Sequence, residues 1–395
     1  MIHSFSRLVQ VIAALGAACS WGYYLLCLWS ASVFLRQRRA TERRSAESSL
    51  PASALPPVSI LKPLKGTDPE IYQSFRSHCL QDYPEYEIIF GVSDPNDPAV
   101  ASVRQLQGEF PARSIRLIVC HRTTGANIKV SNLAQMLPEA RYQHLLINDS
   151  DIRVEPDYLR RVMAPLANPQ VGMVTCLYRG VAQATLGSRM ESLGVSTDFC
   201  AGVLAARQLE GGLRFSLGST MAFRRANLEQ IGGFESFADY LADDYELGKR
   251  IADLRLEVIL SDVVVETNLP AYSLPQFFLH QLRWARGVRD SRAGGYFGLA
   301  LTFGLLWSCI MVIASGAALW AWALAGTTLF LRVAVALQVG QRVLSDRQLL
   351  GQLWLLPLRD LIAVAVWMAS LAGHTVTWRG DRFKLKNGRL IRISP

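Results

Sequence analysis

The chain has 395 residues, 50% of them hydrophobic, and a formal net charge of +9 that is carried mostly by arginine. A mean hydropathy of +0.19, with the apolar residues gathered towards the two ends, argues against a purely soluble protein and predicts a membrane protein with a soluble middle. The basic residues cluster beside apolar stretches without a nucleic-acid-binding motif, so we expect the membrane as a partner and no nucleic acid.

Residues 8–35 carry no charge and are long enough to cross the roughly 30 Å hydrocarbon core of a bilayer. A cleaved signal peptide is the alternative, but its apolar core is shorter, and no small-x-small cleavage site follows here. Five arginines come directly afterwards: Arg36, Arg38, Arg39, Arg43 and Arg44. By the positive-inside rule this flank faces the cytoplasm. We therefore expect a transmembrane anchor over 1–36 and a basic linker over 37–57.

Residues 58–292 are expected to form a cytoplasmic α/β domain. Short apolar runs that end in polar residues alternate with helical segments. The runs cover residues 58–61, 86–92, 115–119, 145–147 and 171–178, and the helices include 99–109, a segment around Asn132 and a small-residue stretch up to about 209. This alternation predicts a parallel α/β sheet. GxGxxG and GxxxxGKS are absent from the sequence, so dinucleotide and P-loop sites have no support.

The most informative motif is LLINDSDIRV, residues 145–154, in which an apolar run leads into Asp149 and Asp151. Open α/β sheets bind ligands at the carboxyl ends of their strands. An Asp-x-Asp pair at such an edge suits a hard divalent cation, Mg²⁺ or Mn²⁺, whose other ligands are phosphate oxygens. The alternative is an acidic turn in which Asp149 caps a helix, and the short motif taken alone favours that alternative.

Two later motifs add to this picture. Asp243 and Asp244 open a predicted helix, where the helix dipole favours acids, so they are either a simple first-turn pair or catalytic groups. Residues 276–286, QFFLHQLRWAR, mix aromatic and basic side chains at helical spacing. That pattern is typical of an amphipathic helix on a membrane surface, which does not exclude a role in the site.

The last third, residues 293–378, is apolar again. Residues 297–316 and 317–339 are predicted to be two spans joined by a tight turn. A third stretch, 353–374, is interrupted by Pro357, Arg359 and Asp360, and we expect it to be re-entrant or interfacial because charges in mid-span are costly. It leads to a basic tail, 379–395, which we expect in the cytoplasm.

In combination, these motifs resemble the GT-A nucleotide-sugar glycosyltransferases, and specifically glycosyltransferase family 21, the ceramide glucosyltransferase family. The family pattern is three separated aspartates followed by (Gln/Arg)-x-x-Arg-Trp, and this chain departs from it in having His280 at the first position of the last motif. The matching stretches are residues 61–69, 82–87, 94–99, 149–150, 152–154 and 243–245, with Lys129, Asn132, Arg283, Trp284, Trp378 and Arg379.

The resemblance implies an inverting enzyme that moves a sugar from a UDP-sugar donor to the hydroxyl of a membrane lipid. The excess of arginine over lysine suggests a bacterial chain and makes it most similar to the hopanoid-biosynthesis members. Those imply transfer of N-acetylglucosamine to bacteriohopanetetrol at the bacterial inner membrane. Ceramide with UDP-glucose is the alternative within the family, and a processive polysaccharide synthase is a more distant one.

Residue roles also follow from the resemblance. Asp244 is the expected general base, with Asp243 as second choice, and Arg283 and Trp284 are expected to close over the diphosphate and the acceptor. Asp149 and Asp151 would hold Mg²⁺ or Mn²⁺ against the diphosphate. The residues expected to bind the UDP-sugar are Lys62, Pro63, Lys65, Asp94, Lys129, Asp149 and His280.

Overall fold

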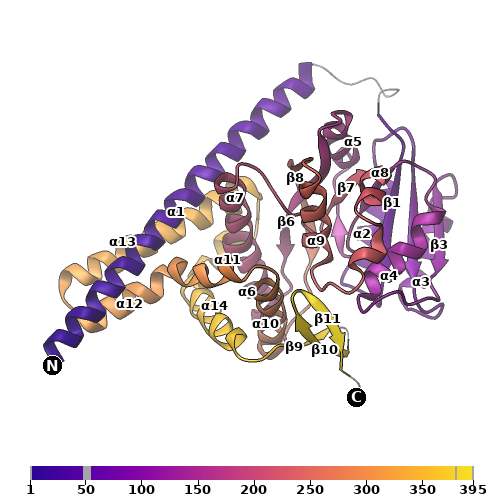
Figure 1. The fold of residues 1–395 in the computed structure, drawn as a ribbon. Coiled ribbons are helices and arrows are strands. Elements are labelled where there is room, and N and C mark those ends of the chain that lie inside the picture. Colours follow the sequence, from indigo (N-terminus) through magenta and orange to yellow (C-terminus); the bar gives the residue numbers. More distant parts are fainter. Residues whose placement is uncertain (1, 48–54, 379, 394–395) are drawn as a thin grey trace.

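The computed structural model describes residues 2–47, 55–378 and 380–393 (Figure 1). Its centre is an eight-stranded sheet in the order β3-β2-β1-β4-β7-β6-β8-β5. The strands are β1 (Val58–Leu64), β2 (Tyr86–Val92), β3 (Ser114–Val119), β4 (His144–Ile147), β5 (Ile152–Arg153), β6 (Val171–Val181), β7 (Met221–Arg224) and β8 (Glu257–Asn268). The expected α/β fold is therefore confirmed.

The expected parallel pairing holds for one half of this sheet. Strands β1 to β4 run parallel, with the helices α2 (Ile71–Cys79), α3 (Ala99–Glu109) and α4 (Ile128–Met136) in their connections. In the other half, β6 and β8 also pair in parallel. The expectation is wrong for β7, which lies antiparallel between β4 and β6, and for β5, which pairs antiparallel with β8. The parallel half aligns the carboxyl ends of β1, β2 and β4 at one edge.

The second half of the domain carries the remaining helices: α5 (Tyr158–Met163), α6 (Leu186–Gly194), α7 (Cys200–Leu209), α8 (Arg225–Gln230), α9 (Asp243–Asp253) and α10 (Leu274–Ser291). A π-helical segment, η4 (Val195–Phe199), joins α6 to α7. Helix α10 begins at a capping box, in which the Ser273 side chain accepts from the backbone N–H of Gln276 and the Gln276 side chain accepts from that of Ser273.

The membrane-type helices are α1 (Ile2–Glu47), α11 (Ala293–Gly298), α12 (Gly304–Ala314), α13 (Leu319–Ala336) and α14 (Leu356–Leu371). In the described part of the chain, three helices are long and apolar enough to cross a membrane: Ser4–Arg43, Leu319–Val343 and Leu349–Leu371. A fourth candidate is the pair Ala293–Thr302 and Gly304–Ala314, which is bent by 48°.

The predicted linker starts too early. Helix α1 continues through the arginine cluster to Glu47, because residues 36–47 contain no glycine or proline and Arg38 forms an ion pair with Glu42 one turn away, at 3.1 Å. The part of the linker at 48–54 lies outside the described residues.

Helices α12 and α13 form a hairpin along α1 (Figure 1). At its turn, the hydroxyl of Ser6 donates to the carbonyl oxygen of Ala314 at 2.9 Å. At its other end, Arg38 donates to the carbonyl oxygen of Val343 at 3.3 Å. The hairpin thus runs out along α1 and back to the arginine-rich end, as two crossings would require.

The stretch expected to be interrupted, 353–374, contains an unbroken α-helix from Leu356 to Leu371. Pro357 lies in the first turn of α14, where it removes no helical hydrogen bond, and both charged residues face protein. The segment contacts the α/β domain near both of its ends. Just before it, the side-chain oxygen of Gln348 accepts from the backbone N–H of Ala182, and near its end, Arg286 of α10 donates to the carbonyl oxygen of Ala372. This placement fits an interfacial position, although the length would also allow a span.

The basic tail folds into a small antiparallel sheet that the sequence did not predict: β9 (Thr375–Trp378), β10 (Asp381–Lys386) and β11 (Arg389–Arg392). It packs on the loop before α9, where the backbone N–H of Leu241 donates to the carbonyl oxygen of Gly388 at 3.0 Å. The tail therefore lies against the α/β domain, where its apolar side chains pack on Leu241 and Ala126. Figure 1 shows this small sheet beside the domain.

Candidate active site

Four charged side chains from three segments meet at the carboxyl edge of the sheet: Lys129, Asp149, Asp243 and Asp244, here named the aspartate cluster. The Nζ of Lys129, in the first turn of α4, lies 2.7 Å from Oδ1 of Asp149 and 3.1 Å from Oδ2 of Asp243. Burial opposes a charge on Lys129, but the nearby aspartates outweigh burial and raise its pKa above the ordinary value. Lys129 therefore stays protonated and holds two of the predicted residues together.

Asp244 is held in place by backbone donors. Its Oδ2 accepts from the N–H of Gly218 at 2.9 Å and its Oδ1 from the N–H of Tyr245 at 2.8 Å. Burial, and then the charge of Asp243, raise the pKa of Asp244 to about 6. The carboxylate is therefore ionised at neutral pH and is a stronger base than an exposed aspartate.

Gly218 lets the two carboxylates converge. A Cβ atom at this position would lie 2.9 Å from Oδ2 of Asp149 and 3.3 Å from Oδ2 of Asp244. A larger residue would crowd the space that these oxygens share. This role of Gly218 has no sequence motif, because it depends on the approach of loops that are distant in the chain.

Asp151 faces a different partner. Its Oδ2 accepts from the hydroxyl of Thr267 on β8 at 2.5 Å, and burial, then the charge of Asp149, raise its pKa to about 6. Among the described residues, no group of three or more His, Cys, Asp or Glu is arranged to hold a metal ion by itself. A cation here would need donors from a ligand, which is how Mg²⁺ is commonly held, by one or two carboxylates and substrate phosphates. The half-exposed carboxylate of Asp149 fits that requirement.

The residues expected at the nucleotide lie nearby on neighbouring strands. Asp94 follows β2, is exposed, and accepts from the N–H of Asn96 at 2.8 Å. Pro63 is buried in β1 and Lys65 is exposed just after it. Lys62 is fully buried, and its Nζ donates to the carbonyl oxygen of Asp149 at 3.1 Å. Burial lowers the pKa of Lys62 to about 7. Its observed contact is thus with the backbone of the Asp149 loop.

Helix α10 presents His280 and Trp284 in a row of aromatic rings. The ring of His280 stacks on Tyr272, with centroids 5.3 Å apart, and lies 5.5 Å from Trp284. The row continues from Trp284 to Phe199 at 5.9 Å and from Phe199 to Tyr178 at 5.4 Å. We name these five side chains the aromatic row.

The aromatic row extends from α10 towards the aspartate cluster. Burial raises the pKa of Tyr178 well above its ordinary value, and the charges of Asp244, Glu191 and Asp149 add to that effect. At the other end, burial and then Glu191 raise the pKa of Tyr272 to about 12, against the charge of Arg283. The row of rings thus runs from Tyr272 through the α10 motif to Tyr178, which lies within the influence of the Asp149 and Asp244 charges.

Several contributing residues were not expected from the sequence. Asn127 caps α4 through its side chain, which also donates to Oδ1 of Asp243 at 3.3 Å. Glu191 is buried beneath His280, and Tyr178, Phe199 and Tyr272 complete the aromatic row. The Asn-x-Lys sequence at 127–129, directly before a predicted helix, could have indicated Asn127 as a helix cap. Glu191 lies in a stretch of small residues without a motif.

Comparison with known proteins fits this geometry. The sequence profile of glycosyl transferase family 21 matches residues 12–391. Ceramide glucosyltransferase 1 of Caenorhabditis elegans is 26% identical over 357 residues, which cover 87% of this chain and 75% of that protein. Ceramide glucosyltransferase of Komagataella phaffii is 37% identical over 101 residues, which cover 25% of this chain and 20% of the relative.

Among solved structures, mannosyltransferase PcManGT from Pyrobaculum calidifontis, in complex with GDP-Man and Mn²⁺, has a similar fold. The TM-score is 0.56 at 21% identity, and the match covers 92% of this chain and 99% of that chain. The expected GT-A fold is confirmed by this likeness, which says nothing by itself about donor or acceptor. With a family profile that spans nearly all of its length, the chain belongs to glycosyl transferase family 21.

Proposed function

We propose that the chain transfers glucose from UDP-glucose to the hydroxyl of a ceramide at a membrane surface. One observation carries the proposal. The carboxylates of Asp149 and Asp244 share one space beside Gly218, and the aromatic row extends from Tyr178 to Trp284 on α10. Helix α10 in turn contacts the membrane-type helix α14. A nucleotide-sugar and a lipid can meet at such a place. The two relatives described above are ceramide glucosyltransferases, which supports the choice of acceptor and donor.

The relatives therefore favour ceramide and glucose over the expectation drawn from arginine content, which was N-acetylglucosamine and bacteriohopanetetrol. Arginine content reflects genome composition as much as function, whereas similarity over 87% of the chain includes the site itself. The proposed placement is a membrane anchored through 1–36 and 293–378, with residues 58–292 and the tail on the cytoplasmic side, as the arginine flank suggests.

We assign the general base to Asp244. A lipid hydroxyl is a poor nucleophile until a positioned carboxylate begins to take its proton, and such help is worth about 10²–10⁴ in rate. Asp244 combines a raised pKa with fixed orientation by Gly218 and Tyr245. Asp243 is instead engaged by Lys129 and Asn127, so it is better placed to hold the cluster together. Attack from the side opposite to the departing UDP inverts the anomeric carbon.

Asp149 is the residue best placed to hold a divalent cation, with Asp151 supporting the same loop. Bound there, Mg²⁺ or Mn²⁺ would neutralise charge that develops on the diphosphate. Lys129 would hold the second oxygen of Asp149, and Lys62 its backbone. Asp94, Pro63 and Lys65 would border the nucleotide. Arg283 would supply charge at the diphosphate, and Trp284, flanked by His280, would form an apolar wall for the lipid.

Mass spectrometry of lipids from a host that expresses the chain tests this function. With ceramide and UDP-glucose present, we expect glucosylceramide from the wild type and far less from Asp244→Asn. An N-acetylhexosamine-bearing hopanoid as the product, with ceramide left unmodified, would contradict the proposed substrates. A lack of any new glycolipid would contradict the proposed activity.

A further inference from the structure

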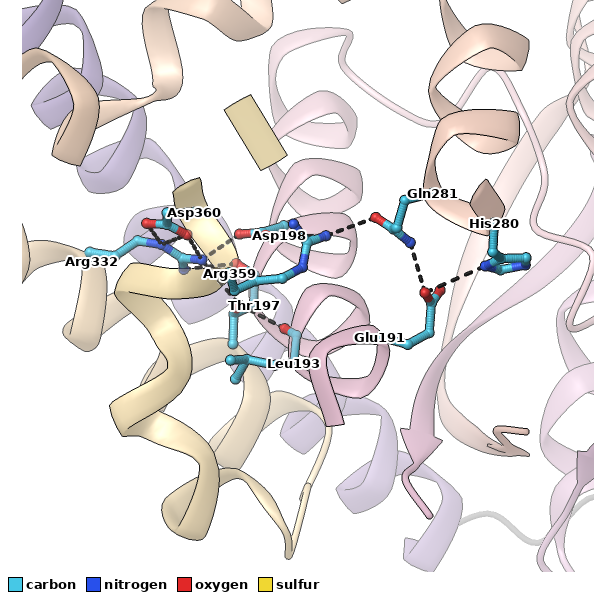
Figure 2. A network of polar contacts seen from close by, with 9 residues as sticks. All are labelled: Glu191, Leu193, Thr197, Asp198, His280, Gln281, Arg332, Arg359 and Asp360. Atoms are coloured by element: carbon cyan, nitrogen blue, oxygen red, sulfur yellow. Dashed lines mark hydrogen bonds and ion pairs between the residues drawn. The ribbon is translucent and has the colours of Figure 1, made fainter. Parts of the chain in front are cut away.

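A chain of polar contacts runs from the membrane-type helices to the α10 motif (Figure 2). It starts at Arg332 on α13, whose buried guanidinium donates to Asp360 of α14 at 2.8 Å and to Asp198 of η4 at 2.5 Å. Arg359 of α14 lies 3.7 Å from the other oxygen of Asp198. We name Asp198, Arg332, Arg359 and Asp360 the membrane-side cluster. Two positive and two negative charges balance within it, which lowers the cost of burying them.

The chain continues through Gln281, the residue after His280. Its Oε1 accepts from Nη2 of Arg359 at 3.0 Å, and its Nε2 donates to Glu191 at 2.8 Å. A guanidinium can only donate and an ionised carboxylate can only accept, so the amide satisfies both neighbours in one orientation alone. Gln281 therefore connects α10 to both α14 and α6 in a defined geometry.

Glu191 brings the chain to the aromatic row. This carboxylate is 2% exposed and lies 3.4 Å from Nδ1 of His280. The ring of His280 is packed between Tyr272 and Trp284, so its position affects the wall that leads to the aspartate cluster. Figure 2 shows Glu191 between Gln281 and His280, in contact with both.

Close packing against Gly194 makes the position of the Arg359 side chain sensitive to substitution at residue 194. A Cβ atom on Gly194 of α6 would lie 2.4 Å from Nη2 of Arg359, so the guanidinium reaches Gln281 across a bare stretch of backbone. The atom it would meet is the end of a flexible side chain. An alanine at 194 should therefore leave α6 folded and move the guanidinium away from Gln281.

We propose that Arg359, Gln281 and Glu191 are positioning residues for lipid glycosylation: they transmit the placement of α14 to His280 and Trp284, and so fix the acceptor side of the active site. The proposal rests on the proposed function in that the acceptor is a lipid. It assigns these residues no contact with the donor, which binds at the aspartate cluster. Their loss should therefore affect acceptor use and spare donor binding.

Gln281→Met tests this, because it keeps the size of the side chain and removes both hydrogen bonds. Gly194→Ala is a second variant that displaces Arg359 without removing a charge. Gln338→Met is the matched control: Gln338 also accepts from an arginine, Arg342, and donates to Ser32, but it lies outside the chain of contacts. For each purified protein we would measure the dissociation constant of UDP and the transfer kinetics with lipid acceptor.

For Gln281→Met and Gly194→Ala we expect kcat/KM for the lipid to fall by up to about 10²-fold, as misplacement by roughly 1 Å can cause. The dissociation constant of UDP should stay within about twofold of wild type, as in Gln338→Met. A fall no larger than in the control would overturn the proposal. Parallel loss of UDP binding and transfer would overturn it as well, because that indicates general disruption.

His280 provides a rescue experiment. His280→Leu removes the partner of Glu191 and should lower kcat/KM for the lipid, whereas His280→Gln and His280→Arg can donate to Glu191 and should keep most of it. Equal loss in all three variants would contradict positioning by Glu191. Transfer is scored as labelled sugar in total lipid, so a product other than glucosylceramide would refute the proposed substrates while still reporting on these variants.

Discussion

The aspartate cluster and the membrane-side cluster are both built from buried or half-buried charges, but they differ in balance. The aspartate cluster sets three carboxylates against one ammonium. The membrane-side cluster sets two guanidinium groups against two carboxylates. An excess of negative charge calls for a cation from outside, whereas a balanced cluster is complete in itself. We therefore propose that the aspartate cluster binds a cation together with its ligand, whereas the membrane-side cluster holds helices in place.

Loss of the proposed cation site in the aspartate cluster should have the largest effect on activity. We expect Asp149→Asn to abolish transfer while the protein still folds and inserts, because the half-exposed carboxylate that would face the cation is lost. Chelation by EDTA should inactivate the wild type, and Mn²⁺ or Mg²⁺ should restore it. Turnover of purified enzyme measured in excess chelator checks this, and full activity there would refute the role of a metal.

The second prediction separates the two neighbouring acids. Asp244→Asn should lower turnover by about 10²–10⁴ and keep UDP-sugar binding, because the base is lost but the donor site is not. Asp243→Asn should keep a larger share of turnover. Calorimetry for binding and lipid product for turnover distinguish the two steps. Near-normal turnover in Asp244→Asn, or loss in Asp243→Asn alone, would show that the assignment is wrong.

Disruption of the membrane-side cluster should lower the free energy of unfolding. Arg332→Leu leaves Asp198 and Asp360 without their shared partner, and breaking a buried ion pair in this way costs about 3–5 kcal/mol of unfolding free energy. Arg214→Leu, which breaks an exposed pair with Asp253, should cost about 0–1 kcal/mol. Denaturant unfolding in detergent compares the two variants. Equal costs would mean that the membrane-side cluster is not a structural unit.

The smallest effect on activity is expected from cysteine substitutions that report the topology by labelling. Cysteines introduced at the exposed positions Lys386 and Lys249 should react from the same side of the membrane, because the tail packs on the α/β domain. A cysteine at Ser315, in the turn between α12 and α13, should react from the opposite side. Activity should stay near wild type. Labelling of Lys386→Cys from the side opposite to Lys249→Cys would show that Leu349–Leu371 crosses the membrane.

The sequence was sufficient for the elements that have their own local signal. Apolar runs ending in polar residues predicted β1 to β4, and the acids at the start of α9 were recognised before their contacts were known. Strand direction has no such signal, so the antiparallel insertion of β7 was missed. The tail strands were also missed, because alternation over four to six basic and apolar residues is a weak pattern beside so much positive charge.

Contacts between separate segments of the candidate site could likewise not be predicted from the sequence. Spacing along the chain paired Asp149 with Asp151, but the contacts join Asp149 to Lys129 and Asp151 to Thr267. Such partners come from separate loops and depend on how strands meet. Glu191 and Gln281 could not be found from spacing at all, since their importance lies in contacts with α10 and α14.

In the proposed mechanism, a cation and the donor diphosphate together complete the aspartate cluster. Electron paramagnetic resonance of Mn²⁺ bound to purified protein, measured with and without UDP, tests it most directly. We predict that UDP markedly tightens Mn²⁺ binding to the wild type and that Asp149→Asn removes this effect. Mn²⁺ binding that is indifferent to UDP, or that survives unchanged in Asp149→Asn, would contradict the account.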